Sequence, residues 1–263
     1  MSDPKAPESP QAEGQQETFI SHLIELRSRL MKSIIAVVVV LVCLVPWAKD
    51  IYALLAAPLL RVLPKGATMI ATDVTGTFFV PLKVTLMTAF LLALPYVLWQ
   101  AWAFVAPGLY HSEKRLAVPV IVSSFVFFLI GMAFAYFFVF PIAFGFFAQY
   151  TPEGVTMMTD IDKYLSFVLT MFVAFGVTFE VPVVVIVLVR LRIVSLEKLR
   201  AIRPYVIVGA FVAGAIFTPP DVVSQLLLAV PLWLLYELGM ICARFMLPPP
   251  VDADVATESE APK

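Results

Sequence analysis

The sequence predicts an all-α, polytopic integral membrane protein with six transmembrane helices. Hydrophobic residues make up 61% of its 263 residues and charged residues 14%, whereas soluble domains are about 45–50% apolar and about 25% charged. Apolar runs that suit a hydrocarbon core about 30 Å thick recur along the chain. Residues 19–247 are expected to form the membrane domain. Residues 1–18 and 248–263, rich in Pro and acidic residues, are expected to be disordered cytoplasmic tails.

The expected spans can be given in chain order. Six runs share the apolar character: about 32–48, 81–105, 116–140, 164–189, 205–217 and 222–240. Pro46 is expected to kink the end of the first run and Pro141 to end the third. The last two spans are expected to be short, because the 13 residues of the fifth reach only about 20 Å as a helix and Glu237 interrupts the sixth. The apolar stretch 51–60 is expected to lie on the membrane interface.

The basic residues predict the orientation of the chain. If the N-terminus is cytoplasmic, 13 of the 18 Lys and Arg residues fall on the cytoplasmic side, where positively charged loops are retained. We therefore expect both termini to be cytoplasmic. The external turn at 218–221 is expected to place Asp221 as the cap of the sixth helix.

Several motifs of enzymes and cofactor-binding proteins are missing from the sequence. It has no phosphate-binding G-x-x-x-x-G-K-[ST] loop, and no nucleophile–base pair is evident. His22 and His111 lie outside the expected spans, which argues against an intramembrane haem or metal site. The pattern favours a binding or conducting protein that is not an enzyme and uses no cofactor or metal.

Glu25 lies just before the first span, in a segment with the pattern of an amphipathic helix. Four apolar residues recur at i, i+4, i+7 and i+11 and form one stripe: Phe19, Leu23, Leu26 and Leu30. Glu25 lies off this stripe. One interpretation is an i,i+4 ion pair between Glu25 and Arg29 on an interfacial helix. The other is a carboxylate that receives a cationic ligand.

Two further acids stand out by their surroundings. Glu113 lies beside Lys114 and Arg115, and it is either an incidental acid in a basic loop or a second receiver of a cationic ligand. Glu180 is the only charged residue among the 26 residues of the fourth run, at a depth where a carboxylate costs about 2.5–3.5 kcal/mol on insertion scales. It either forms a satisfied hydrogen bond within the membrane or faces a wet or partner-filled concavity, which Gln225 could join.

Taken together, these segments resemble the TatC family, the multispanning receptor subunit of the twin-arginine protein translocase. The matching stretches are HLIELRSRL at 22–30, TMIATDVTGTFFVPLK at 68–83, QAWAFVAPGLYHSEKR at 100–115, GMAFAYFFVFPIAFGFF at 131–147, DIDKYLSFVLTMFVAFGVTFEVPV at 160–183 and RPYVIVGAFVAGAIFTPPDVVSQ at 203–225. The resemblance runs from about Thr18 to Arg244 and leaves out both tails. One departure is Lys114-Arg115, where the family often has two arginines.

The resemblance implies protein export across the inner (cytoplasmic) membrane, driven by the proton-motive force. It implies binding of twin-arginine signal peptides of folded cargo, and an oligomeric complex with TatA-like and TatB-like single-span proteins and membrane lipid, without nucleic acid. It also implies three groups of site residues: Glu25, Glu113, Phe104 and Leu109 for the signal peptide, Glu180 and Gln225 for the partner helices, and Pro58 and Asp221 as structurally sensitive external positions.

Two other functions fit parts of the pattern. A proton-coupled transporter would use Glu180 as its proton carrier, but the two halves of the chain share no internal repeat of the kind many transporters have. A purely structural scaffold would organise other helices without binding a signal peptide. The receptor interpretation is preferred because of the resemblance.

Overall fold

The protein is described from a computed structural model over residues 10–60, 68–105, 117–150, 158–219 and 221–246. In this part of the chain the structure is helical apart from one pair of three-residue strands. The chain divides into two compact units, Met1–Val177 and Thr178–Lys263, and each unit has its own packing.

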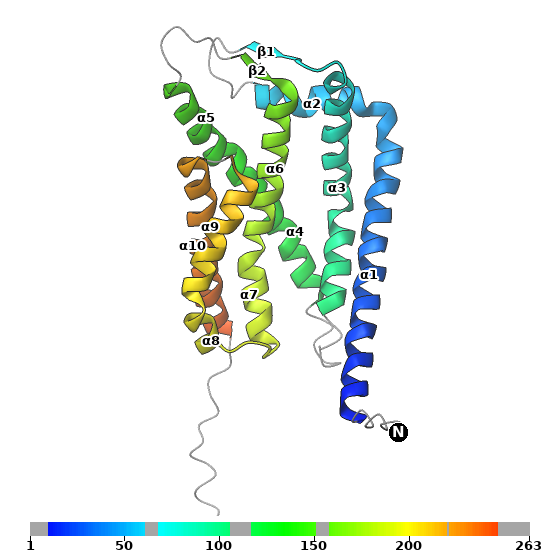
Figure 1. The fold of residues 1–263 in the computed structure, drawn as a ribbon, viewed down its shortest axis with the longest axis vertical. Coiled ribbons are helices and arrows are strands. Elements are labelled where there is room, and N and C mark those ends of the chain that lie inside the picture. Colours follow the sequence, from blue (N-terminus) through cyan, green and yellow to red (C-terminus); the bar gives the residue numbers. More distant parts are fainter. Residues whose placement is uncertain (1–9, 61–67, 106–116, 151–157, 220, 247–263) are drawn as a thin grey trace, which may run out of the picture. The chain divides into compact units, whose positions relative to one another are not determined.

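Unit 1 is built on two long helices that run side by side (Figure 1). α1 spans Pro10–Leu44 and α3 spans Gly76–Val105. α1 gives way to a 3-10 turn, η1 (Val45–Trp47), and then to α2 (Ala48–Leu60), which packs against α3. The break at Pro46 is confirmed, and the segment expected to lie on the membrane interface is a helix.

α1 begins earlier than the sequence led us to expect. The expected tail extends to residue 18, whereas the helix starts at Pro10. Proline is tolerated in the first helical turn, because its missing N–H would have no helical partner there. The Ala, Gln and Glu residues that follow are good helix formers, so the helix can extend outward from the span.

The third apolar run continues through the proline that was expected to end it. α4 (Ala117–Phe134) passes through a π-helical turn, η4 (Ala135–Val139), into α5 (Phe140–Gln149). The π turn changes the hydrogen-bond register, and Pro141 then lies in the first turn of a new α-helical segment, where its missing N–H is tolerated. The prediction that Pro141 ends this helix is therefore wrong.

Aromatic rings join this bent helix to α6 (Ile161–Phe179). The ring centroids of Phe134 and Phe175 are 5.8 Å apart, and those of Phe140 and Phe172 are 5.3 Å apart. Tilted and edge-on pairs of this kind contribute about 0.5–1.5 kcal/mol each beyond the apolar area they bury. They hold α6 in unit 1.

Two short strands tie together connecting segments that are far apart in the sequence. β1 (Thr68–Ile70) pairs in parallel with β2 (Met158–Asp160), with Thr68 opposite Met158 and Ile70 opposite Asp160. β1 lies shortly before α3 and β2 immediately before α6. The pairing therefore fixes the starts of two helices of unit 1 beside each other.

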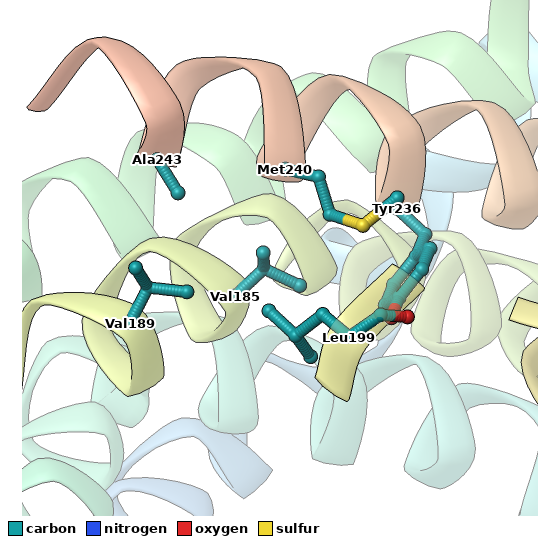
Figure 2. Packing of buried hydrophobic residues seen from close by; sticks show 6 residues of the cluster. All are labelled: Val185, Val189, Leu199, Tyr236, Met240 and Ala243. Atoms are coloured by element: carbon teal, nitrogen blue, oxygen red, sulfur yellow. The ribbon is translucent and has the colours of Figure 1, made fainter. Parts of the chain in front are cut away.

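Unit 2 contains four helices in the described residues: α7 (Val181–Arg190), α8 (Leu196–Ala201), α9 (Arg203–Phe217) and α10 (Val222–Met246). Figure 2 shows the buried core of this unit, which α7, α8 and α10 supply: Val185, Val189, Leu199, Tyr236, Met240 and Ala243. The Tyr236 hydroxyl donates a hydrogen bond to the Leu199 carbonyl oxygen at 2.8 Å. This bond satisfies the polar end of an otherwise apolar cluster.

Only one of the last two apolar helices is short. α9 has 15 residues and reaches about 22 Å, whereas the 25 residues of α10 reach about 37 Å, more than the hydrocarbon core. The prediction of a short sixth span is wrong because Glu237 does not end α10. Its Oε2 accepts a hydrogen bond from Arg203 at 2.7 Å, so the charge is paired beside α9.

The described residues contain five helical segments that are long and apolar enough to cross a membrane, with α9 as a shorter apolar helix. The five segments are Ile20–Leu54, Gly76–Phe104, Val118–Phe147, Ile161–Arg190 and Val222–Phe245. The all-α membrane fold is confirmed. The count of six spans is compatible with these helices and stays a prediction.

The contact between Gly176 of α6 and Phe128 of α4 tests the packing of unit 1. The buried Phe128 ring fills the space that a Cβ at position 176 would occupy. Gly176→Ala is expected to force the ring aside and to lower the free energy of unfolding by about 1–3 kcal/mol, measured by thermal unfolding in detergent. Gly145→Ala in α5 is the matched control, because the new Cβ would have no described neighbour within 4 Å beyond the helix's own nearby backbone. Equal stability of the two variants would contradict the packing.

Candidate functional site

One face of α1 carries a line of polar residues. His22, Glu25, Arg29 and Ser33 are spaced at i, i+3, i+7 and i+11, so they share one face of the helix. Arg29 reaches Gln100 of α3, and Ser33 is buried, so this polar face turns toward α3. The described members of the apolar stripe predicted from the sequence are exposed, as suits a surface covered by lipid: Leu23, Leu26 and Leu30.

Arg29 holds the Glu25 carboxylate in place and is itself bonded to Gln100. Nε and one terminal nitrogen of Arg29 donate to Glu25 Oε1 at 2.9 and 2.7 Å, and the other terminal nitrogen donates to Gln100 Oε1 at 3.4 Å. The Glu25 side chain is 34% exposed and the Arg29 side chain 25% exposed. Because both bonds use Oε1, Glu25 Oε2 has no donor among the described residues. The i,i+4 pair offered as one interpretation is present, and the Glu25 side chain stays part-exposed.

Phe104 lies beside the same polar face of α1. The ring of His22, one turn before Glu25, stacks on the Phe104 ring with centroids 4.3 Å apart and 25° between the planes. Of the four residues that the resemblance assigns to the signal peptide, the structure thus brings Glu25 and Phe104 to one region. Leu109 and Glu113 lie outside the described residues.

Gln100 is a residue of this region that reasoning from the sequence missed. Its side chain is the only amide or charged group between Val84 and Val105, and the residue is 7% exposed. A lone amide in an apolar span needs a hydrogen-bond partner in another helix. That isolation in the sequence is the signal that could have identified it.

Glu180 stands between two helices of the fourth apolar run. α6 ends at Phe179 and α7 begins at Val181, with Pro182 in its first turn. The Glu180 backbone stays helical, with φ −73° and ψ −19°. Its carbonyl accepts a hydrogen bond from Val184 N at 2.9 Å, and its side chain is half-buried. The fourth apolar run is therefore divided into two helices at its charged residue.

Asp221 and Gln225 fasten the start of α10. Asp221 Oδ1 accepts a hydrogen bond from Ser224 N at 2.7 Å, which confirms the predicted helix cap. Gln225 Nε2 donates to the Phe211 carbonyl oxygen of α9 at 2.9 Å. The glycine at position 214 permits this close approach, because a Cβ there would lie 2.9 Å from Gln225 Cγ. Gln225 therefore joins α9 to α10.

Gln225 and Glu180 lie at different levels of unit 2. Gly239 of α10 packs on α7, where a Cβ at 239 would lie 2.9 Å from Pro182 Cα. Gln225 precedes Gly239 by 14 residues, which is about 21 Å along a helix. This separation argues against one polar patch shared by Gln225 and Glu180. Pro58 is part of α2, and its side chain lies outside the described part of the structure.

Asp160 anchors the strand pair to the chain that follows β1. Its carboxylate accepts hydrogen bonds from the Thr72 hydroxyl, from Thr72 N at 3.1 Å, and from the backbone N of Asp162 and Lys163 at 2.9 and 3.1 Å. These donors, the Thr72 hydroxyl foremost, favour the charged carboxylate and lower the pKa of Asp160 to about 2. Beside it, Lys83 of α3 pairs with Asp162 of α6 at 2.7 Å.

The fold and these contacts define a class of protein: a polytopic helical membrane protein with a part-exposed acid on the polar face of its first helix. Within the described residues, no group of three or more His, Cys, Asp or Glu side chains could hold a metal ion. The Glu25 carboxylate accepts oriented hydrogen bonds from a cationic side chain, that of Arg29.

Comparisons with known proteins agree with one another. The family model of the Sec-independent protein translocase protein (TatC) matches residues 21–231. The chain is 57% identical over 229 residues to the Sec-independent protein translocase protein TatC of Escherichia coli (strain K12), covering 87% of this chain and 89% of that protein. It is 50% identical over 247 residues to the protein of the same name from Haemophilus influenzae, covering 94% and 96%. A crystal structure of a twin arginine translocase receptor, TatC, matches with a TM-score of 0.75 and 40% identity, covering 85% of this chain and 98% of that one.

The chain belongs to the TatC family. It is a membrane-embedded subunit of a Sec-independent protein translocase, which makes it a transport component rather than an enzyme. The family named from the sequence segments is confirmed.

The Asp160 contacts predict a pH dependence of stability. A carboxylate whose pKa is about 2 in the folded protein and about 3.9 in the unfolded chain contributes stability above pH 4, and this contribution is lost as the pH falls toward 2. We expect wild type to unfold at a higher temperature than Asp160→Asn at pH 6, with the difference shrinking between pH 4 and pH 2. A difference that stays constant over this range, measured by thermal unfolding in detergent, would contradict the assignment.

Proposed function

We propose that this chain is the receptor that binds twin-arginine signal peptides of folded cargo proteins at the cytoplasmic face of the inner membrane. Glu25 and Glu113 receive the paired arginines, and Phe104 and Leu109 contact the neighbouring part of the signal peptide. The observation that carries the proposal is the Glu25 carboxylate, which is part-exposed and has Oε2 without a donor among the described residues. Phe104 of α3 stacks on His22, which lies one helical turn before Glu25 on α1.

The orientation of the chain supports this assignment. Both termini are taken as cytoplasmic because most basic residues then fall on that side. In this arrangement six helices cross the membrane, and the Glu25 end of α1 lies at the cytoplasmic surface, where an unexported signal peptide is found. Transport itself is driven by the proton-motive force in this proposal, and the chain supplies recognition.

Charge interactions and apolar contact make different contributions to the binding of the signal peptide. A part-exposed ion pair contributes about 0–1 kcal/mol, so two such pairs cannot hold a cargo protein alone. Removing the apolar stretch of a signal peptide from water contributes about 25 cal/mol per Å². Glu25 and Glu113 therefore determine which signal peptides bind, while apolar contact supplies most of the affinity. An arginine presents two parallel N–H donors to a carboxylate, and a lysine cannot do so.

We also propose that the chain assembles with TatA-like and TatB-like single-span proteins through Glu180 and Gln225. Glu180 lies within an apolar span, where a carboxyl group is stabilised by hydrogen bonds to polar groups on neighbouring helices. Gln225 uses its Nε2 to bind Phe211, so its amide oxygen can accept a bond from a partner. Because the two residues lie at different levels, they would contact a partner at two depths. Asp221 and Pro58 maintain the external ends of the helices.

The recognition site can be tested by removing its charge. Glu25→Gln and Glu113→Gln keep the side-chain size and remove the negative charge, so each is expected to weaken binding of a twin-arginine signal peptide by up to about fivefold. Photo-crosslinking of the peptide to membranes that contain each variant measures the change. The loss should shrink as salt is raised, because salt screens the charge interaction.

Glu197→Gln provides the control for this experiment, because Glu197 is an exposed acid on α8 of unit 2. It is expected to leave the crosslinking unchanged. Undiminished crosslinking to the Glu25→Gln, Glu113→Gln double variant would show that these acids do not recognise the signal peptide.

The partner contact can be tested from Val184, one turn beyond Glu180 and exposed. A photo-reactive residue at 184 is expected to crosslink to a TatA-like or TatB-like helix when those proteins are present. Glu180→Ala should reduce this product at least about threefold if it removes one intramembrane hydrogen bond. Adducts with lipid alone, from the otherwise unaltered protein, would refute the contact.

A further inference from the structure

We propose that Arg29 is a specificity-determining residue of this site, because it neutralises the Glu25 carboxylate before the signal peptide arrives. The proposal rests on the proposed function, since it concerns how Glu25 selects among incoming cations. In this proposal Glu25 favours binding of the twin-arginine peptide, whereas Arg29 disfavours binding of a peptide that carries lysines.

The geometry places Arg29 where a ligand arginine would otherwise bind. Its guanidinium gives two hydrogen bonds to Glu25 Oε1, at 2.9 and 2.7 Å. Its remaining terminal nitrogen donates to Gln100 at 3.4 Å. Gln100 is nearly buried and belongs to α3, 71 residues away in the sequence. Arg29 is therefore held from both sides, and it retains its place on Oε1 when another cation approaches.

The chemistry of the two cations then differs at the remaining oxygen, Oε2. The Glu25–Arg29 pair has no net charge, so it attracts a further cation only weakly by charge alone. A lysine ammonium is compact and strongly hydrated, and it loses water without a net negative charge to compensate. A guanidinium is more weakly hydrated and can place two N–H donors on a single oxygen, as Arg29 does on Oε1, so an arginine still gains at Oε2. Arg29 thus weakens the binding of a ligand lysine more than it weakens the binding of a ligand arginine.

Removal of the Arg29 charge tests this inference. In Arg29→Gln the Glu25 carboxylate is left with its full charge, which attracts any cation. We expect a leader peptide with two lysines to bind about three- to fivefold more tightly than it binds wild type, the size expected for one part-exposed ion pair. A matched peptide with two arginines should gain less affinity from the same substitution. The ratio of the two dissociation constants should therefore move closer to one. Fluorescence titration of each peptide with the receptor in lipid nanodiscs gives both dissociation constants.

Two further variants separate specificity from a general effect. Arg27→Gln makes the same charge change two residues away, on an exposed side chain of the same helix, and it should leave the preference within about twofold of wild type if the effect is local. Arg29→Lys keeps the charge beside Glu25 and should retain most of the preference. A purely structural role for Arg29 would change the binding of both peptides equally, and Arg29→Lys would not then restore the difference between them.

The outcomes distinguish this inference from the proposed function. If Arg29→Gln binds the lysine peptide no better than Arg27→Gln does, the inference is overturned. If Glu25→Gln, measured in the same assay, binds the arginine peptide as tightly as wild type, the site itself is wrongly assigned. A loss of affinity in Glu25→Gln, together with a narrowed preference in Arg29→Gln and a retained preference in Arg29→Lys, supports both.

Discussion

A charged side chain in an apolar medium requires a partner, and this requirement organises much of the structure. The described residues contain three ion pairs: Glu25–Arg29, Lys83–Asp162 and Arg203–Glu237. The second joins α3 to α6 in unit 1, and the third joins α9 to α10 in unit 2. A charge costs several kcal/mol in the hydrocarbon region when it is alone, and pairing reduces that cost. The first pair lies on the polar face of α1, where Arg29 also contacts Gln100 of α3.

Local features of the sequence predicted most of the fold. The apolar runs marked the spanning helices, Pro46 marked the end of α1, and Asp221 was identified as a cap from the turn before it. The errors came from non-local structure. Pro141 does not end its helix because a π turn precedes it, and Glu237 does not end α10 because Arg203, 34 residues earlier, pairs with it. The β1–β2 pairing likewise joins segments that no local pattern connects.

The candidate site was predictable only in part. The spacing of Glu25 and Arg29 indicated their ion pair, but it did not indicate Gln100 or the stack of His22 on Phe104. The periodicity of α1 predicted an apolar face and a polar face, but it did not predict which of them packs against another helix. In water the apolar face would be buried, whereas in lipid apolar side chains lose nothing by facing outward and polar groups gain by meeting another helix. The polar face of α1 therefore packs against α3. Leu109 and Glu113 lie outside the described residues, so their place at the site stays a prediction.

In the proposed mechanism, carboxylates select the signal peptide by the geometry of its cations, while apolar contact provides most of the affinity. The most direct measurement compares two leader peptides, identical except for paired arginines or paired lysines, for binding to the wild-type protein over a range of salt concentrations. We expect the arginine peptide to bind several-fold more tightly at low salt, and the difference between the two affinities to shrink at high salt while both peptides stay bound. Equal affinities at low salt would contradict this mechanism.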